Sequence, residues 1–159
     1  MYDMSGKTVV VSGAAGGIGA AVARRFAAAG ATLVLGDLNA VALEELAGEL
    51  AALTTVHALT CDVSVPADCQ NLMDTAAADA GGIDVLINTA GVWTEGPSDQ
   101  TTEEEWDKVL GVNLKGTFFC CRYAIPHLKT TEGCIINLSS DAGSWARRRR
   151  PCTRPPKAA

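Results

Sequence analysis

The stretch VVVSGAAGGIGA, residues 9–20, decides the fold of this chain. Its β-branched run belongs to a predicted buried strand over residues 7–12, and the alanine-rich sequence after it predicts a helix over 20–30. Between the two elements lie Gly13, Gly17 and Gly19. Glycines permit a tight bend and a close approach of the backbone to a ligand. Since the positive end of the following helix attracts anions, the stretch predicts a phosphate-binding turn. Ordinary strand-to-helix packing of small residues is the alternative.

Short apolar runs and longer helical stretches continue to alternate up to residue 140. Four further strands are predicted, over residues 31–37, 55–62, 82–91 and 133–140. Three further helices are predicted, over residues 40–53, 66–80 and 101–129. Asp37 or Asn39 is expected to cap the first of these helices, and Pro126 to kink the last turn of the third. Because apolar strands that alternate with helices are typical of a parallel sheet covered on both faces, we expect an α/β fold. The predicted architecture is a Rossmann-like doubly wound sheet of five strands, in one dinucleotide-binding domain over residues 1–143.

The composition is that of a folded protein, because hydrophobic residues make up 48% and charged residues only 19%. The net charge of −5 is unevenly distributed. All 18 acidic residues lie within 1–144, whereas 145–159 contain six of the 13 basic residues and no acid. An acidic body repels nucleic acid and anionic membranes, and no apolar run reaches the roughly 18 residues of a membrane span. We therefore expect neither partner, and the opening MYDMSGK, which does not resemble a signal peptide, favours a cytoplasmic location.

The six cysteines occur without a CxxC pair, and the two histidines are not spaced with them as metal ligands would be. We expect reduced and inert thiols, most of them buried as small hydrophobic residues. No metal site is predicted.

Asp37 ends the predicted strand 31–37, at the place where a carboxylate can accept hydrogen bonds from an adenosine ribose. A basic side chain that binds a 2′-phosphate would be expected at position 16 or 38. These positions hold Gly16 and Leu38 instead of a lysine or an arginine. The sequence therefore predicts NAD rather than NADP as the cofactor. A helix cap is the alternative role for Asp37.

Five short motifs share their order and spacing with a known family. They are Ser12-Gly13 with Gly17, Ile18 and Gly19; Asp62-Val63; Asn88-Thr89-Ala90-Gly91; Asn113; and Ile135 to Ser140. Over residues 5–143 the sequence resembles the short-chain dehydrogenase/reductase family. The family's corresponding motifs are TGxxxGxG, an Asp-Val pair that contacts adenine, NNAG, a catalytic asparagine and NxSS. Each motif is weak alone, but five of them in order are specific. Thr89 stands in place of the second asparagine of NNAG.

This resemblance implies hydride transfer between a nicotinamide cofactor and an alcohol or carbonyl substrate. It implies that Ser140 orients the substrate oxygen and that Asn113 holds a proton-relay water. A strand-end hydroxyl and a hydrogen bond at a helix kink are the structural alternatives for these two residues. The residues implied to bind NAD are Ser12, Gly13, Gly17, Ile18, Gly19, Asp37, Leu38, Asp62, Val63, Asn88, Ala90 and Gly91.

The tyrosine and lysine of the family's YxxxK motif are expected about a dozen residues beyond Ser140, and the pair is missing there. Lys157 has the nominal position of the lysine, but Thr153 stands where the tyrosine should be. Pro155 and Pro156 would also break the helix that puts both side chains on one face. The spacing of Lys157 is therefore interpreted as a coincidence.

Residues 144–159 are interpreted as an aberrant, basic and disordered tail. We hypothesise that one nucleotide was lost near the codon of Ser144 in a longer dehydrogenase, or that the sequence contains an error. Codons read across the residue boundaries permit a tyrosine at position 153 and a lysine from Pro156 and Lys157. The family's C-terminal strands and helices would then be missing. A binding arm for nucleic acid or an acidic surface is the less favoured interpretation of the tail.

Two functions remain open for the body of the chain. One is an NAD-dependent dehydrogenase whose activity is impaired by the missing tyrosine, and the other is a catalytically inactive NAD-binding module. Members of the family commonly form tetramers through the helix that corresponds to 101–129 and the next helix. Only the first of these is expected here, which speaks against the family's homo-oligomer. Leu114, Phe118 and Phe119 would be left uncovered, which predicts poor solubility.

Overall fold

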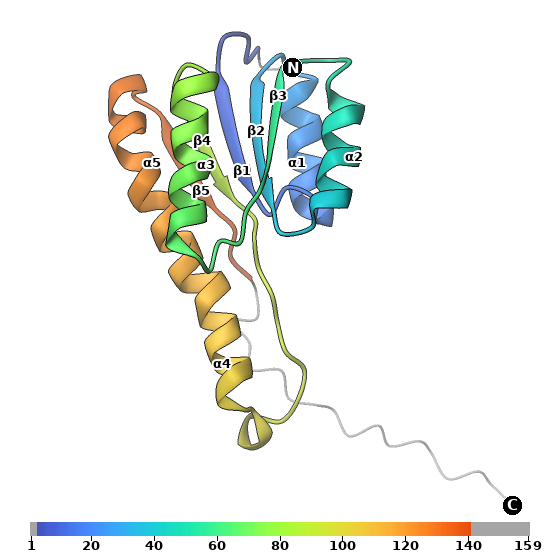
Figure 1. Cartoon of the computed structure of the whole chain (residues 1–159), viewed down its shortest axis with the longest axis vertical. Helices are drawn as coiled ribbons and strands as arrows, with labels where there is room; N and C mark the ends of the chain where they lie inside the picture. Colours follow the sequence, from blue (N-terminus) through green and yellow to red (C-terminus); the bar gives the residue numbers. More distant parts are fainter. Residues whose placement is uncertain (1–2, 141–159) are drawn as a thin grey trace, which may run out of the picture.

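Five parallel strands form one sheet with the order β3-β2-β1-β4-β5 (Figure 1). The computed structural model of the chain describes residues 3–140. Within them the strands are β1 Thr8–Ser12, β2 Thr32–Asp37, β3 Val56–Thr60, β4 Val85–Asn88 and β5 Cys134–Asn137. The chain moves outward from β1 through β2 and β3, and then returns to the other side of β1 with β4. Ligand sites of open parallel sheets lie at such a reversal of strand order, beyond the carboxyl ends of the strands.

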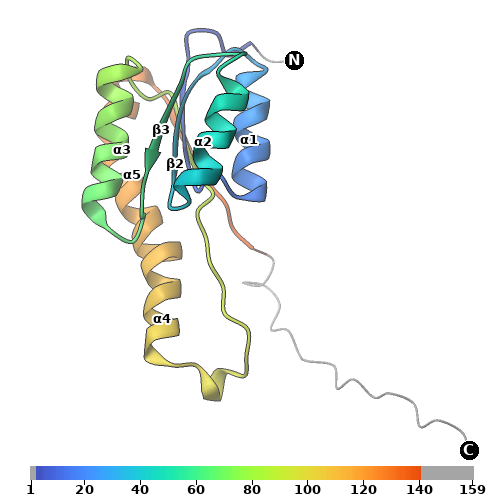
Figure 2. The same ribbon diagram turned by 45° about the vertical axis from the view of Figure 1, so that its right-hand side comes forward.

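Helices cover both faces of the sheet (Figures 1 and 2). They pack in pairs, α1 (Gly17–Ala27) with α2 (Ala40–Leu50) on one face and α3 (Pro66–Asp79) with α5 (Thr117–Thr131) on the other. The side chains of β1 alternate between two hydrophobic cores, since Val9 and Val11 face α1 and α2 whereas Val10 faces α3 and α5. Every residue of β1 is buried, as expected of a strand inside a covered sheet. The predicted α/β fold with a doubly wound, five-stranded parallel sheet is confirmed.

Several predicted elements differ from the structure at their ends. α1 begins within the glycine-rich turn at Gly17, three residues earlier than predicted, and ends at Ala27. Gly30, with a φ of +86°, then carries the chain towards β2. α2 is capped by Asn39, whose side chain accepts a hydrogen bond from the backbone N–H of Ala42 at 3.2 Å. Asp37 is therefore not the cap of this helix.

The long helix predicted over 101–129 contains an irregular turn. It consists of α4 (Glu103–Leu110), a π-helical turn η2 (Gly111–Gly116) and α5, after a short 3₁₀ turn η1 (Ser98–Gln100). Thr102 and Glu105 form a reciprocal capping box at its start. α5 continues through Pro126, and a π-helical turn, η2, precedes it in the same long helix. Figure 1 shows α4 extending past the end of the sheet.

Among residues 3–140, β5 is an edge strand of the sheet and pairs with β4 on one side. Three of the four residues of β5 are exposed, and so are the apolar side chains of Ile136 and Leu138. No helix within residues 3–140 is long and apolar enough to cross a membrane. The interpretations of 144–159, of Thr153 and of Lys157 lie outside the described residues.

Candidate functional site

The glycine-rich turn joins β1 to α1 at the strand reversal, and its glycines have two different roles. Gly13 has a φ of +72°, and a Cβ there would lie 2.5 Å from the backbone N and Cα of Ala90. A Cβ on Gly19 would collide with the carbonyl oxygen of Gly13. These two glycines are therefore required by packing. Around a Cβ on Gly17, in contrast, no described heavy atom lies within 4 Å, so the turn leaves open space for a ligand at that point.

The N-terminus of α1 offers backbone donors to this open space. The first turn of a helix has N–H groups without intrahelical acceptors, and they carry the positive end of the helix dipole. Within the described chain, the N-cap residue Gly16 makes no side-chain capping bond, and the first turn contains no acidic residue. Ile18, in the same turn, has an exposed side chain. The turn thus has the features of an anion site, and its glycines match the close approach that a pyrophosphate needs.

Asp37, the last residue of β2, lies against this turn. Its Oδ2 accepts a hydrogen bond from the backbone N–H of Ala15 at 2.9 Å, and its Oδ1 accepts one from Asn39 at 2.9 Å. Each carboxylate oxygen has a second lone pair for a ligand hydroxyl. The neighbouring Leu38 is 67% exposed and supplies no charge. The structure therefore brings Asp37, Leu38 and the glycine-rich turn together at one edge of the sheet.

Two predicted cofactor residues have side chains that are buried between strands. Ser12 is 1% exposed and Asn88 4%. The hydroxyl of Ser12 donates to Asn88 Oδ1 at 3.0 Å, which joins β1 to β4. Asn88 Nδ2 donates to Asn137 Oδ1 at 2.8 Å and to the Cys121 Sγ at 3.4 Å, which extends the network to β5 and α5. These side chains join β1, β4 and β5 inside the sheet, so they are not exposed to a ligand at its edge.

Sequence reasoning missed the partners of this network, Asn137 and Cys121. Asn137 lies directly opposite Asn88 in the pairing of β4 with β5. A polar residue at the end of each of two apolar strands was the available signal, because polar side chains buried between strands need hydrogen-bond partners.

Asp62 and Val63, the predicted contacts of the adenine, follow β3 in a compact turn. Asp62 Oδ1 accepts hydrogen bonds from the backbone N–H and the hydroxyl of Ser64, at 2.9 and 2.7 Å. Val63 is buried, and its side chain leaves no room for a Cβ on Gly116. The structure thus places Asp62 at the same edge as Asp37, and it places Val63 beneath η2.

Asn113 lies in the π-helical turn η2 and is joined to the loop after β4. Its Oδ1 accepts from the backbone N–H of Val92, and its Nδ2 donates to the Val92 carbonyl, both at 2.8 Å. The carbonyl of Asn113 accepts a hydrogen bond from the Thr117 hydroxyl at 2.9 Å. The alternative that Asn113 makes a hydrogen bond at an irregular turn of the helix is thus present in the structure. Gly91, next to Val92, is exposed on this loop.

Ser140, the predicted catalytic serine, follows β5 and is exposed. The preceding strand is tied to β4 by a hydrogen bond from the N–H of Leu138 to the carbonyl of Asn88, at 3.1 Å. Ser140 therefore lies beyond the carboxyl end of β5, at the same edge of the sheet as the loop after β4. The positions 153 and 157 expected for the tyrosine and lysine are not among the described residues.

Buried thiols occupy the core behind the site. Burial raises the pKa of Cys61 to about 12, and the hydrogen bond with Cys69, together with burial, raises the pKa of Cys120. Of the five cysteines among the described residues, Cys61, Cys69 and Cys120 are buried, Cys121 is partly buried and Cys134 is exposed, in agreement with the prediction that most of the thiols are buried. Within residues 3–140 no three potential metal ligands come together.

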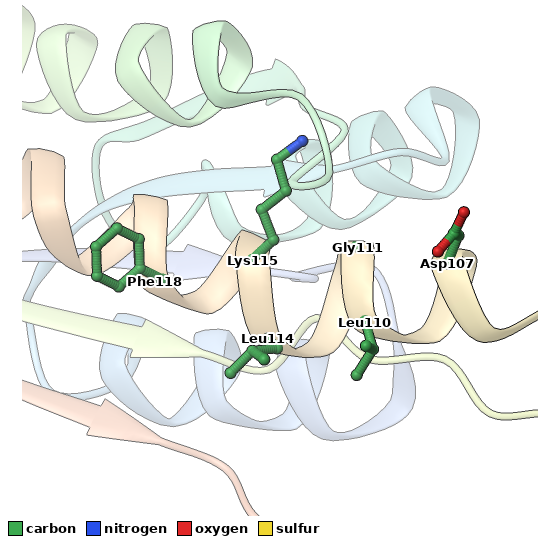
Figure 3. A pocket seen from close by; sticks show the side chains of 6 residues that line it. All are labelled: Asp107, Leu110, Gly111, Leu114, Lys115 and Phe118. Carbon is green, nitrogen blue, oxygen red and sulfur yellow. The ribbon is translucent and has the colours of Figure 1, made fainter.

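A shallow hollow lies apart from the glycine-rich turn, along the long helix (Figure 3). Its lining residues recur every three or four positions on one side of α4, η2 and α5, and they are Asp107, Leu110, Gly111, Leu114, Lys115 and Phe118. Leu114 is 65% and Phe118 60% exposed, as predicted for an uncovered helix face. Phe119 differs from the prediction because it is partly buried against the core.

Comparison with known proteins agrees with the fold and with the motifs of this site. A family model described as short chain dehydrogenase matches residues 7–152. The meso-2,3-butanediol dehydrogenase of Serratia marcescens is 40% identical over 137 residues, which cover 86% of this chain and 54% of the relative. The chain therefore belongs to the short-chain dehydrogenase/reductase family, whose members are oxidoreductases that use NAD(P).

Solved structures extend the likeness to the whole described sheet. A glucose/ribitol dehydrogenase of the family from Brucella melitensis is 34% identical, with a TM-score of 0.86 over 90% of this chain and 60% of that one. An alcohol dehydrogenase from Thermococcus sibiricus, solved with 5-hydroxy-NADP, is 29% identical, with a TM-score of 0.85 over 89% of this chain and 61% of that one. The present chain thus spans little more than half the length of these relatives.

Proposed function

We propose that this chain is an NAD-preferring member of its family that binds the cofactor through the glycine-rich turn and Asp37, and that acts on an alcohol or a carbonyl compound with impaired turnover. The observation that carries the proposal is the 2.9 Å hydrogen bond from Ala15 N to Asp37 Oδ2. It places a carboxylate beside the positive end of α1, within one site.

The preference for NAD follows from charge. A carboxylate at Asp37 accepts hydrogen bonds from ribose hydroxyls, whereas it repels a 2′-phosphate at the same place. Gly16 and Leu38 supply no compensating cation. Arg24, further along α1, is already engaged by Glu49 through two hydrogen bonds, at 2.7 and 2.6 Å. We therefore expect NADH to bind more tightly than NADPH.

In this proposal, one group of residues binds the cofactor and another positions the substrate. The N-terminus of α1 binds the pyrophosphate, Gly17 leaves room for it, and Asp37 holds the ribose. A bound nicotinamide supplies the hydride chemistry. On the substrate side, Asn113 fixes the loop after β4, and Ser140 orients the oxygen of the alcohol or carbonyl.

We expect turnover to be impaired because Thr153 stands at the position expected for the family's tyrosine. A positioned general acid contributes about 10² to 10⁴ in rate. An NAD-binding module without turnover is the second candidate, and the absence of this tyrosine is the observation that favours it.

Isothermal titration with NADH and NADPH tests the cofactor proposal on the full chain. We expect NADH to bind at least tenfold more tightly, and Asp37→Asn to reduce that ratio, whereas the control Asp79→Asn, at the exposed end of α3, leaves it unchanged. Tighter binding of NADPH, or no binding of either cofactor, would contradict the proposal.

An oxidation assay with meso-2,3-butanediol, the substrate named for the Serratia relative, separates the two candidate functions. Cofactor binding with slow turnover supports the impaired enzyme. Cofactor binding without turnover of this or other short diols supports the NAD-binding module.

A further inference from the structure

We propose that Thr89 is a positioning residue for the cofactor, because its hydroxyl fixes the carbonyl groups of the glycine-rich turn. This inference rests on the proposed function. Thr89 is the first residue after β4, and its side chain is partly buried. In the sequence, Thr89 replaces the second asparagine of the family's Asn-Asn-Ala-Gly motif.

The hydroxyl of Thr89 contacts two successive carbonyl oxygens of the turn. Its Oγ1 lies 2.7 Å from the oxygen of Ser12 and 3.0 Å from the oxygen of Gly13. The backbone N–H of Thr89 donates to the same Ser12 oxygen at 3.0 Å, as the last hydrogen bond between β1 and β4. The hydroxyl therefore extends the attachment of β4 by one peptide beyond the sheet, to the residue at which the turn begins.

Gly13 needs such an attachment, because its φ of +72° is accessible mainly to glycine, and glycine has the least intrinsic restraint of any residue. From the side of β2, the N–H groups of Gly13 and Ala14 both donate to the oxygen of Gly36, at 2.8 and 3.0 Å. From the side of β4, the hydroxyl of Thr89 shares its single proton between the oxygens of Ser12 and Gly13, and within the turn the N–H of Gly16 also donates to the Gly13 oxygen at 3.3 Å. The turn is thus fixed between two strands, and Thr89 supplies the only side-chain contact with the Gly13 carbonyl that the described residues show.

The hydroxyl of Thr89 also lies near the start of α1. A Cβ on Gly19 would lie 2.7 Å from Thr89 Oγ1, so the first turn of the helix approaches the hydroxyl at a residue without a side chain. The N–H groups of this turn are the ones that face the pyrophosphate. Hydrogen bonds to an anion depend on donor distances of about 2.7–3.2 Å, so a small shift of the helix start weakens several of them together. Loss of the hydroxyl is therefore expected to reduce cofactor affinity in addition to stability.

The test compares Thr89→Val, which removes the hydroxyl with little change of volume, with Thr89→Ser, which retains it. Thr54→Val is the matched control, because Thr54 also donates its hydroxyl to a backbone oxygen, that of Ala31 at 2.7 Å, and precedes β3 at the opposite edge of the sheet. The dissociation constant of NADH is measured by calorimetry and the free energy of unfolding by urea denaturation, on full chains. Thr89→Ala serves as a second variant without the hydroxyl if Thr89→Val does not fold.

We expect Thr89→Val to weaken NADH binding about tenfold or more, and Thr89→Ser and Thr54→Val to bind within about twofold of the wild type. Thr54→Val should nevertheless lose unfolding free energy comparable to that lost by Thr89→Val, which separates positioning from stability. Unchanged binding by Thr89→Val, or an equal loss of affinity in Thr54→Val or Thr89→Ser, would overturn the inference while leaving the proposed function intact. Absence of binding by the wild-type chain would overturn both.

Discussion

Asn113 and Val92 are joined by two hydrogen bonds of 2.8 Å each, so that one side-chain amide satisfies both backbone groups of a loop residue. The two residues lie 21 positions apart in the chain. The pair connects the π-helical turn η2 to the loop that follows β4. It thereby fixes the part of the site next to Gly91.

Replacing Asn113 by alanine should release this loop. Each of the two hydrogen bonds contributes roughly 0.5–1.5 kcal/mol, so we expect a loss of about 1–2 kcal/mol in the free energy of unfolding. Amide hydrogen exchange at Val92 should become faster. Asn113→Asp retains the acceptor for Val92 N and should protect that amide better than alanine does. An unchanged exchange rate at Val92 in the alanine variant would show that the pair does not form in solution.

The amide network between the strands is expected to be costly to interrupt. Asn137→Ala removes the acceptor at 2.8 Å from the buried Nδ2 of Asn88 and leaves only the sulfur of Cys121 nearby. An unsatisfied buried donor costs about 1–3 kcal/mol, which urea denaturation would measure as a lower midpoint. Asn71→Ala, at an exposed position of α3, is the control and should change stability by less than about 0.5 kcal/mol. Equal effects of the two substitutions would argue against the network.

The exposed side chain of Leu38 provides a way to change the cofactor preference. Leu38→Arg puts a cation next to Asp37, where a 2′-phosphate would lie in the proposed complex. We expect NADPH affinity to rise about tenfold, measured by titration calorimetry. Leu53→Arg is a matched control, because Leu53 is similarly exposed but follows the far end of α2. If both variants gain the same NADPH affinity, the effect comes from overall charge rather than from the site.

Stability should fall at alkaline pH because of the buried thiols. The pKa of Cys61 is raised from 9.0 to about 12 by burial, so the folded state retains a proton that the unfolded state loses. Stability from this group is complete below pH 9 and decreases as the pH rises towards 12. Urea denaturation across this range should give a shallower decline for Cys61→Ala than for the wild type. Cys134→Ala, at an exposed position, should show the same decline in stability with pH as the wild type. If the stability of Cys61→Ala declined as steeply as that of the wild type, the prediction would be contradicted.

The apolar stripe on the long helix should promote self-association. Leu114 and Phe118 line the hollow shown in Figure 3, and both side chains are largely exposed. Leu114→Glu combined with Phe118→Glu should increase the monomer fraction in sedimentation velocity. Val41→Glu, at an exposed position on α2, is the control and should leave association unchanged. A wild-type chain that sediments as a single monomeric species would contradict the prediction.

The sequence was sufficient to predict the layers of the fold. The valine run of β1 and the alternation of apolar strands with helices implied a parallel sheet covered on both faces, and the cores around Val9, Val10 and Val11 confirm it. The sequence did not predict the irregular turn in the long helix, because nothing in GVNLKG distinguishes a π-helical turn from an α-helix. That turn is associated with tertiary contacts, namely those of Asn113 with Val92 and of Gly116 with Val63.

By itself, the sequence determined the strand, the glycine-rich turn and the helix at the start of the chain, since these depend on the local periodicity of apolar residues and on the conformational freedom of Gly13. Only the tertiary structure decided that Ser12 and Asn88, 76 residues apart, are bonded to each other inside the sheet, and that Thr89 holds the turn. The physical reason is that partners of polar side chains are set by the register of neighbouring strands. That register arises from packing between distant segments, which no local pattern encodes.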